Sequence, residues 1–385
     1  MKKTLLATAI AGAAAFTAAG AQAATVYNQD GTKLDIYGNV QLVYATQKDD
    51  EGERRDEIAD NGSTFGFAAE HVIYNGLIGY AKIEIDDFKA DEMKVAGRDA
   101  GDTAYIGLKG NFGDARIGSY DSLLDDWIQD PISNNEYFDV SDSNTFKGAP
   151  GQEFSDNDVI VGDPEGDKVT YTSPVWGGFQ FALGTQYKGD NESENLKDSG
   201  EASIFGGLKY TVGGFSIAGV YDDLGIYDID SGNGLFVVDP DTGDVIDAGA
   251  LDDFDLGDQY GVTAQYQWDS LRVAVKYERF ESDNDLLRDA DYYAIGARYG
   301  YLNGMGDVYG SYQYVDLGGD GFGDGDFDLS DLPNDEDNDD DNYNEIVAGV
   351  TYNISDAMYT YVEGAWYDRD ANEGDGYAVG LTYLF

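Results

Sequence analysis

The chain has 385 residues, no cysteine and a formal charge of −52. This excess of acidic residues excludes nucleic acid as a partner, because a phosphate backbone is bound by Lys and Arg. It is compatible with metal cations, basic peptides or a saline medium that screens repulsion between the acids. Without cysteines a secreted chain of this size must be stabilised by backbone pairing and burial. The 51 glycines, 30 tyrosines and only 6 prolines favour an all-β chain with many short strands.

The first residues, 1–23, are predicted to be a secretory signal peptide. Lys2 and Lys3 form a positive start, an apolar stretch follows, and Ala21-Gln22-Ala23 is a cleavage site. Cleavage would leave 21 basic against 75 acidic residues, a charge of −54. No other segment approaches the ~20 apolar residues that a membrane-spanning helix needs. If the mature chain spans a membrane, it therefore does so as β-strands.

From Ala24 onward, apolar and polar residues alternate along segments of about ten residues, which is typical of strands with one face in lipid. Tight turns such as Asn75-Gly76 connect some of these segments. Long acidic connections alternate with the turns, and they are predicted over 46–62, 87–102, 119–166, 188–201, 222–258, 281–290, 316–343 and 368–376. Counting the segments between them predicts roughly sixteen strands, an even number as in bacterial outer-membrane barrels.

The last segment, Gly376 to Phe385, predicts how the sheet is closed. Its alternation places Val379, Leu381, Tyr383 and Phe385 on one face. A soluble protein seldom leaves such an apolar strand at an open edge, because an open edge recruits other strands. In a bilayer the edge must be closed, so the last strand needs the first as its partner.

Tryptophans near strand ends agree with a membrane barrel. Trp176 and Trp268 lie beside short turns and Trp366 before a long loop, as interfacial aromatic girdles require. A soluble β-sandwich explains neither these positions nor the apolar last strand. We therefore predict an all-β fold, a transmembrane antiparallel barrel of about sixteen strands over residues 24–385. Short turns would face the periplasm, and long acidic loops the exterior.

Four segments resemble the general porins of Gram-negative outer membranes, of the gamma-proteobacterial type. They are ATVYNQDGTKLDIYG at 24–38, AYIGLKG at 104–110, FGDARIG at 112–118 and YAVGLTYLF at 377–385. The resemblance covers essentially the whole mature chain, although the loops match poorly. It implies a homotrimer in the outer membrane, in contact with lipid and lipopolysaccharide, that conducts ions and small hydrophilic solutes. It also implies that the third external loop, about 119–166, folds into the lumen.

In the resembling porins an acidic inward loop faces Lys and Arg on the wall, and the field between them sets ion selectivity. The acidic candidates for such a constriction are Asp121, Asp125, Asp126, Asp130, Glu136, Asp139, Asp102 and Glu84. Positions where relatives carry basic residues read Asn39, Thr64 and Asp102, so the usual basic cluster is absent there. The bases that alternation turns inward are Lys82, Lys109, Arg116, Lys168, Lys209, Arg272, Lys276 and Arg298. Either they supply a rearranged cluster, or they pair with Glu84, Glu278 and Glu345 and keep the wall polar.

The resemblance implies a channel and not an enzyme, and the acidic third loop predicts cation selectivity. One alternative is a solute-specific channel in which Trp127, Tyr137 and Phe138 form a stacking slide for a sugar or a peptide; simple packing of the loop is the other interpretation of these aromatics. A further alternative is a receptor or adhesin barrel acting through the loops at 222–258 and 316–343.

The acidic run from Asp316 to Glu345 has no Lys or Arg. Part of it has the first spacing of a calcium-binding loop, in Asp324, Asp326, Asp328 and Asp335, but Leu329 stands where that loop needs glycine. We therefore favour a solvated acidic loop over a site for weakly bound Ca²⁺ or Mg²⁺, and predict no other cofactor.

Overall fold

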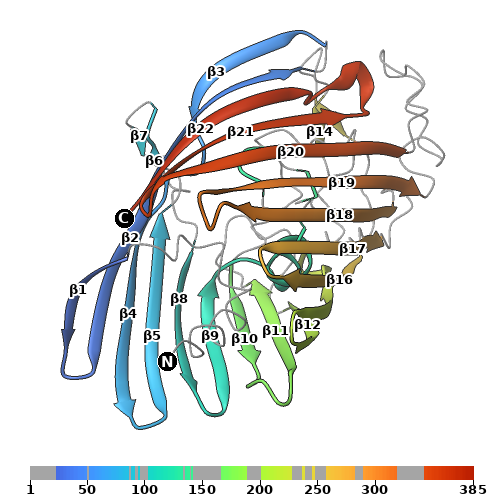
Figure 1. Cartoon of the computed structure of the whole chain (residues 1–385). Coiled ribbons are helices and arrows are strands. Elements are labelled where there is room, and N and C mark those ends of the chain that lie inside the picture. Colours follow the sequence, from blue (N-terminus) through green and yellow to red (C-terminus); the bar gives the residue numbers. More distant parts are fainter. Residues whose placement is uncertain are drawn as a thin grey trace.

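The structure is a computed structural model, shown in Figure 1. It describes residues 23–49, 52–85, 88–91, 94–95, 103–132, 135–138, 140–141, 166–188, 201–227, 236–238, 245–247, 257–281, 289–318 and 342–385. The predictions for the signal peptide over 1–22, for Asp102 and Asp139, and for the calcium-type spacing of Asp324, Asp326, Asp328 and Asp335 lie outside these residues.

Eighteen strands form one antiparallel sheet. The first nine are β1 (Ala24–Gln29), β2 (Thr32–Lys48), β3 (Arg54–Asp60), β4 (Phe65–Tyr74), β5 (Leu77–Ile85), β8 (Ala104–Gly110), β9 (Gly113–Ser119), β10 (Lys168–Thr172) and β11 (Phe179–Lys188). The other nine are β12 (Glu201–Val212), β13 (Phe215–Asp223), β16 (Asp258–Trp268), β17 (Leu271–Glu281), β18 (Asp289–Tyr301), β19 (Gly306–Gly318), β20 (Asn342–Ser355), β21 (Met358–Tyr367) and β22 (Gly376–Leu384).

The remaining described elements are short. Two hairpins pair β6 (Phe88–Lys89) with β7 (Lys94–Val95) and β14 (Phe236–Val238) with β15 (Val245–Asp247). A π-helical turn, η1, covers Asp125–Gln129, and two 3₁₀ turns are η2 (Gly225–Tyr227) and η4 (Asp370–Asn372). Within the described ranges, no helix is long and apolar enough to cross a membrane.

The sheet closes on itself around β2. Residues 39–47 of β2 pair with β22, and residues 32–36 pair on the same side with β1, so the last and first strands together make one strand of the wall. On the other side of β2, β3 and β4 succeed each other in the same way. The eighteen strands therefore occupy sixteen positions, and the predicted barrel is confirmed. Gly38 and Phe385 exchange two backbone hydrogen bonds of 3.0 Å at the seam.

The wall keeps the alternation that the sequence predicts, as β22 illustrates. Tyr377 and Val379 are 49% and 44% exposed on the outer face, whereas Ala378 and Thr382 are 0% and 1% exposed on the inner face. The exposed apolar face requires lipid, because water would drive such a surface to aggregate. Trp176, Trp268 and Trp366 also lie on the exposed outer surface, as an interfacial girdle requires.

The first external connection differs from the sequence-based prediction. We expected a loop over 46–62, but β2 continues to Lys48 and β3 begins at Arg54. The hairpin was missed because its residues are charged on both faces, so no apolar alternation marks it. Backbone pairing does not need that alternation where water reaches both faces of a strand.

Aromatic rings lie flat on glycines of neighbouring strands along the inner wall. A Cβ added to Gly107, Gly349 or Gly380 would overlap the ring of Tyr80, Tyr309 or Tyr361, respectively. Phe205 and Tyr37 cover Gly184 and Gly66 in the same way. These glycines let large rings lie against the sheet, which leaves more of the lumen open.

This packing predicts the effect of one added methyl group. Gly380→Ala should lower the free energy of unfolding by about 1–3 kcal/mol, because the methyl overlaps the Tyr361 ring. Gly219→Ala is the matched control, since its added Cβ would meet neighbouring atoms only at 3.7 Å. Urea unfolding of the barrel in lipid vesicles measures both, and equal stability of the two variants would contradict the packing argument.

Candidate functional site

After β9, the described residues 120–132, 135–138 and 140–141 run through the barrel interior (Figure 1). They pack against its wall in three apolar contacts. The first joins Leu123, Leu124, Trp127 and Ile128 to Ala182, Phe205, Ala218 and Val220 on β11–β13. Farther along, Ile132 packs with Ala274 and Ala294 on β17 and β18. Finally, Phe138 and Val140 pack against β2 and β20–β22. These strands form a different part of the wall from β11–β13, which make the first contact. We call residues 120–132, 135–138 and 140–141 the inward loop.

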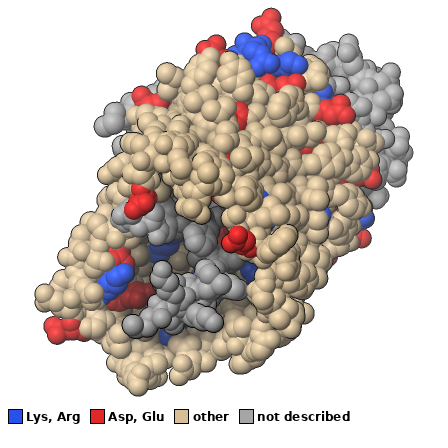
Figure 2. Space-filling view, in the orientation of Figure 1, with Lys and Arg blue, Asp and Glu red and all other residues tan. Residues whose placement is uncertain are grey.

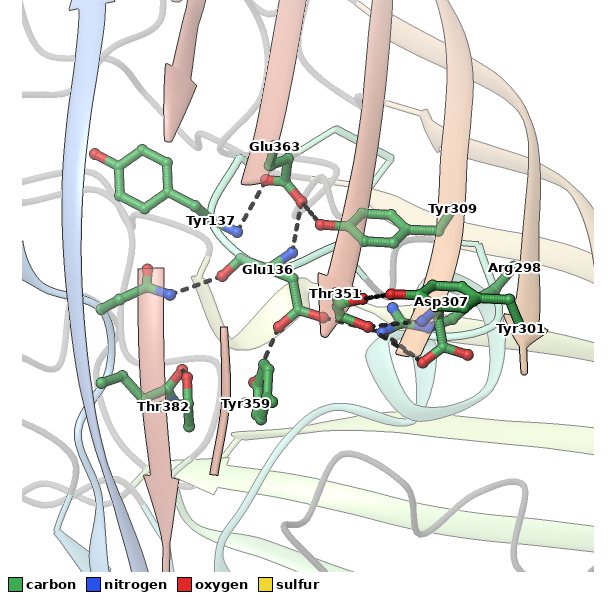
Figure 3. A network of polar contacts seen from close by, with 12 residues as sticks. Glu136, Tyr137, Arg298, Tyr301, Asp307, Tyr309, Thr351, Tyr359, Glu363 and Thr382 are labelled. Carbon is green, nitrogen blue, oxygen red and sulfur yellow. Dashed lines mark hydrogen bonds and ion pairs between the residues drawn. The ribbon is translucent and has the colours of Figure 1, made fainter. Parts of the chain in front are cut away.

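The inward loop is also held by one buried carboxylate, Glu363 of β21 (Figure 3). It accepts backbone N–H bonds from Glu136 at 2.8 Å, Tyr137 at 3.0 Å and Phe138 at 2.7 Å, as well as the hydroxyl of Tyr309. A carboxylate can accept several such bonds at once, and they satisfy loop amides that have no strand partner. Glu363 therefore fixes the height of the loop within the lumen.

The side chain of Glu136 forms a second anchor beside the first (Figure 3). Its carboxylate lies 3.0 Å from Arg298 of β18 and accepts a bond of 2.9 Å from the hydroxyl of Tyr359. Burial raises the pKa of Glu136, and the guanidinium of Arg298 opposes that shift. Arg298 also lies 3.6 Å from Asp307, so this base is shared between the loop and the wall.

A third polar anchor is fully buried. Lys276 of β17 donates to the backbone carbonyl of Ser141 at 2.8 Å and to Glu278 at 2.8 Å. Gln129 of the loop donates to the same Glu278 at 2.8 Å. Because both charged side chains are 0% exposed, this pair is a structural tie and not a solute contact.

Three carboxylates gather where the inward loop begins. One oxygen each of Asp121, Asp125 and Asp126 lies within 4.8 Å of the others, the one grouping of this kind among the described residues. Such close like charges repel one another and attract cations. Arg116 of β9 lies 3.8 Å from Asp126 and is centred 3.8 Å from the ring of Tyr120. Burial raises the pKa of Asp126 to about 6 against the opposing effect of Arg116.

The other predicted bases lie on the inner wall beside acids or aromatic rings. Lys82 is 3.4 Å from Glu84, and Lys109 pairs with Glu70. Lys168 and Lys209 lie over the rings of Tyr120 and Trp127 at 5.2 and 5.3 Å from the centroids. Arg272 is within electrostatic reach of Asp130 and Arg298. Lys82, Lys109 and Arg116 line one part of the wall, whereas Lys209 and Arg272 belong to β12 and β17, so the eight bases do not form a single cluster.

Several residues that hold the inward loop or form ion pairs in the lumen were not predicted from the sequence. Glu363 and Tyr309 hold the loop, and Arg369 pairs with the buried Glu345 at 2.5 Å. Alternation along β21 does turn Glu363 inward, but no pattern shows that a loop amide will reach it. Trp127 and Phe138 are buried at 5% and 1% exposure, so they pack the loop against the wall and form no open slide.

Comparison with known proteins now identifies the family. Residues 7–372 match the Gram-negative porin family. The chain belongs to this family. The porin is 58% identical over 395 residues, covering 100% of both chains, to the "Monosaccharide porin" of Halomonas sp and to the "Major outer membrane protein" of Halomonas elongata. It is 27% identical over 358 residues to "Outer membrane porin F" of Escherichia coli (strain K12), covering 81% of this chain and 92% of that protein.

Solved porin structures share the fold of this porin. The anion-selective porin from Comamonas acidovorans has a TM-score of 0.62 at 18% identity, with 92% of this chain and 100% of that chain covered. OmpF from Salmonella typhi, in complex with daunomycin, has a TM-score of 0.62 at 18% identity, with coverage of 94% and 100%. This porin is therefore an outer-membrane channel protein and not an enzyme.

The Glu363 anchor predicts how the inward loop of this porin loosens. Glu363→Gln should speed hydrogen exchange at residues 136–138 by about ten-fold or more, because losing a bond to a buried donor costs ~1–3 kcal/mol. Glu345→Gln removes another buried lumen carboxylate, and it serves as control because its described partners are the side chains of Gln313 and Arg369 and not amides of residues 136–138. Exchange mass spectrometry in detergent tests the pair, and unchanged exchange in Glu363→Gln would refute the anchor.

Proposed function

We propose that this porin is a water-filled channel for passive diffusion of ions and small hydrophilic solutes, with a preference for cations. The observation that carries the proposal is the convergence of Asp121, Asp125 and Asp126 on the inward loop. Within the described lumen, Lys276 and Arg369 are each offset by a carboxylate at 2.8 and 2.5 Å. At the start of the loop three acids lie together, and the ion pair described among them is the looser contact of Arg116 with Asp126 at 3.8 Å.

The mechanism depends on the radius of the channel and on the electrostatic field inside it, and no bond is made or broken. A sixteen-stranded wall encloses an aqueous channel. The inward loop narrows that channel because it crosses the lumen between β11–β13 and β20–β22. Carboxylates at such a constriction raise the local concentration of cations and repel anions.

Neutralising the three carboxylates tests the selectivity. The triple variant Asp121→Asn, Asp125→Asn, Asp126→Asn should lower the cation-to-anion permeability ratio by about three-fold or more, because the focusing charge is lost. A triple variant of the outer rim, Asp258→Asn, Glu281→Gln, Asp316→Asn, removes equal charge and should leave the ratio unchanged. Reversal potentials in a salt gradient decide, and a wild-type preference for anions would contradict the proposal.

Acidification should weaken the selectivity in a defined range. Since the pKa of Asp126 is raised to about 6, its carboxylate is charged above that pH and is neutralised as the pH falls through it. The permeability ratio for cations should therefore fall between about pH 8 and about pH 5, and Asp126→Asn should remove most of this change. Equal pH profiles of wild type and variant would show that Asp126 does not control the field.

A second candidate, a channel selective for a sugar, is supported by the relative at 58% identity, the "Monosaccharide porin" of Halomonas sp. The receptor or adhesin alternative, which places function in the loops at 222–258 and 316–343, stays a hypothesis, since most of both loops lies outside the described residues. A homotrimer, contact with lipopolysaccharide and removal of residues 1–23 during secretion stay predictions from the family resemblance and the sequence. One structure with the same fold is OmpT of Vibrio cholerae in its trimer form.

A further inference from the structure

A pocket of about 480 Å³ lies on the inner wall, between strands β4, β5 and β8–β11 and the side chain of Asp126. Figure 2 shows basic and acidic side chains together in the hollow on this side of the barrel, over the part of the wall that Figure 1 labels β4, β5, β8 and β9. The pocket is separate from the Glu363 and Glu136 anchors, whose wall residues come from β18, β19 and β21.

Three bases and three acids line this pocket, so their formal charges cancel. The bases are Lys82, Lys109 and Arg116, and the acids are Glu70, Asp114 and Asp126. They are interleaved: Lys109 stands opposite Asp114 across β8 and β9, and it also pairs with Glu70. A pocket without net charge favours neither an anion nor a cation. Because positive and negative groups do not occupy separate walls, it also does not match the charge separation of an amino acid.

Two of the ion pairs leave hydrogen-bonding capacity for a solute. Lys82 lies 3.4 Å from Glu84 and Arg116 lies 3.8 Å from Asp126, both longer than a good N–H···O bond. The side chains of Lys82 and Arg116 are 28% and 26% exposed, so the lumen reaches them. A hydroxyl group can accept from the base and donate to the acid, and it thereby bridges such a pair.

Tyrosine rings add an apolar surface that is held in place. Tyr80 and Tyr105 lie edge to face with centroids 6.0 Å apart. The ring of Tyr80 lies on Gly107, and its hydroxyl bonds to Asp114. Lys109 and Arg116 lie over these two rings at 5.1 and 5.4 Å, so the rings also position the donors. A few fixed polar groups around aromatic surface are typical of a small-molecule site.

We propose that this pocket is a transit site for a neutral, hydroxyl-rich ring of monosaccharide size. Its hydroxyls accept from Lys82 and bridge the Arg116–Asp126 pair, and its C–H surface lies against Tyr80 and Tyr105. The inference rests on the channel function proposed above. It identifies where a sugar-selective channel would bind its solute and which residues would contact that solute.

The test is current recording from the purified full-length protein in a planar bilayer with added D-glucose. Glucose should interrupt the current in a concentration-dependent manner. Arg116→Gln should lower its apparent affinity by about ten-fold, because it removes a charge-assisted hydrogen bond to the solute. Asp114→Asn should lower the affinity by a similar factor, because it weakens the bond that holds the Tyr80 ring in place. Arg369→Gln, which removes a base that does not line the pocket, should leave the affinity unchanged. Circular dichroism in detergent verifies that each variant is folded.

Glycine and gluconate, a zwitterion and an anion, distinguish a hydroxyl site from a charge site, and neither should interrupt the current as glucose does. Normal conductance without glucose interruptions, equal interruptions by glycine, or unchanged affinity in both pocket variants would overturn the site while leaving the channel function intact. Absence of any conductance would overturn the channel function and the site with it.

Discussion

The structure depends on one constraint: in hydrocarbon, every backbone N–H and C=O of the wall must find its partner inside the sheet. The seam shows how this chain meets it. β22 and β1 come from opposite ends of the chain and share one side of β2, and Gly38 and Phe385 pair directly where the two strands meet. The first and last strands of the barrel therefore both pair with β2 and close the sheet. The same constraint explains the strict alternation of side chains, since one face of each strand contacts lipid and the other contacts the lumen.

Closure creates a second requirement, because the inward loop brings backbone amides into the barrel without any strand beside them. Glu363 satisfies three of those amides, and Lys276 satisfies the carbonyl of Ser141. Buried acids and bases on the wall are therefore part of the loop's structure. Their charges are offset within hydrogen-bonding distance, as Lys276 and Glu278 are at 2.8 Å, which limits the cost of removing them from water.

The barrel could be predicted from the sequence because period-two alternation and the apolar last strand are local patterns with a single physical solution. The charged hairpin around residues 48–54 escaped prediction, because outside the membrane a strand needs no apolar face. The acids of the inward loop could be named as candidates, because the sequence places them in the third external loop. The partners of Glu136, Arg298 and Tyr359, could not be named, because they lie 162 and 223 residues away in the chain and only closure brings them near.

Distance and exposure then separate the two roles that charged groups have in this lumen. Lys276 and Glu278 are in close contact at 2.8 Å and 0% exposed, so neither can reach a passing solute. Arg116 and Asp126 are 3.8 Å apart and 26% and 27% exposed, so each keeps hydrogen-bonding capacity toward the channel. A pair that is too loose to stabilise the wall strongly is, for the same reason, available to solutes. Solutes are therefore expected to contact the ion pairs with the longest distances. In this barrel such a pair is Arg116–Asp126, where the acidic start of the inward loop faces the tyrosine-lined wall.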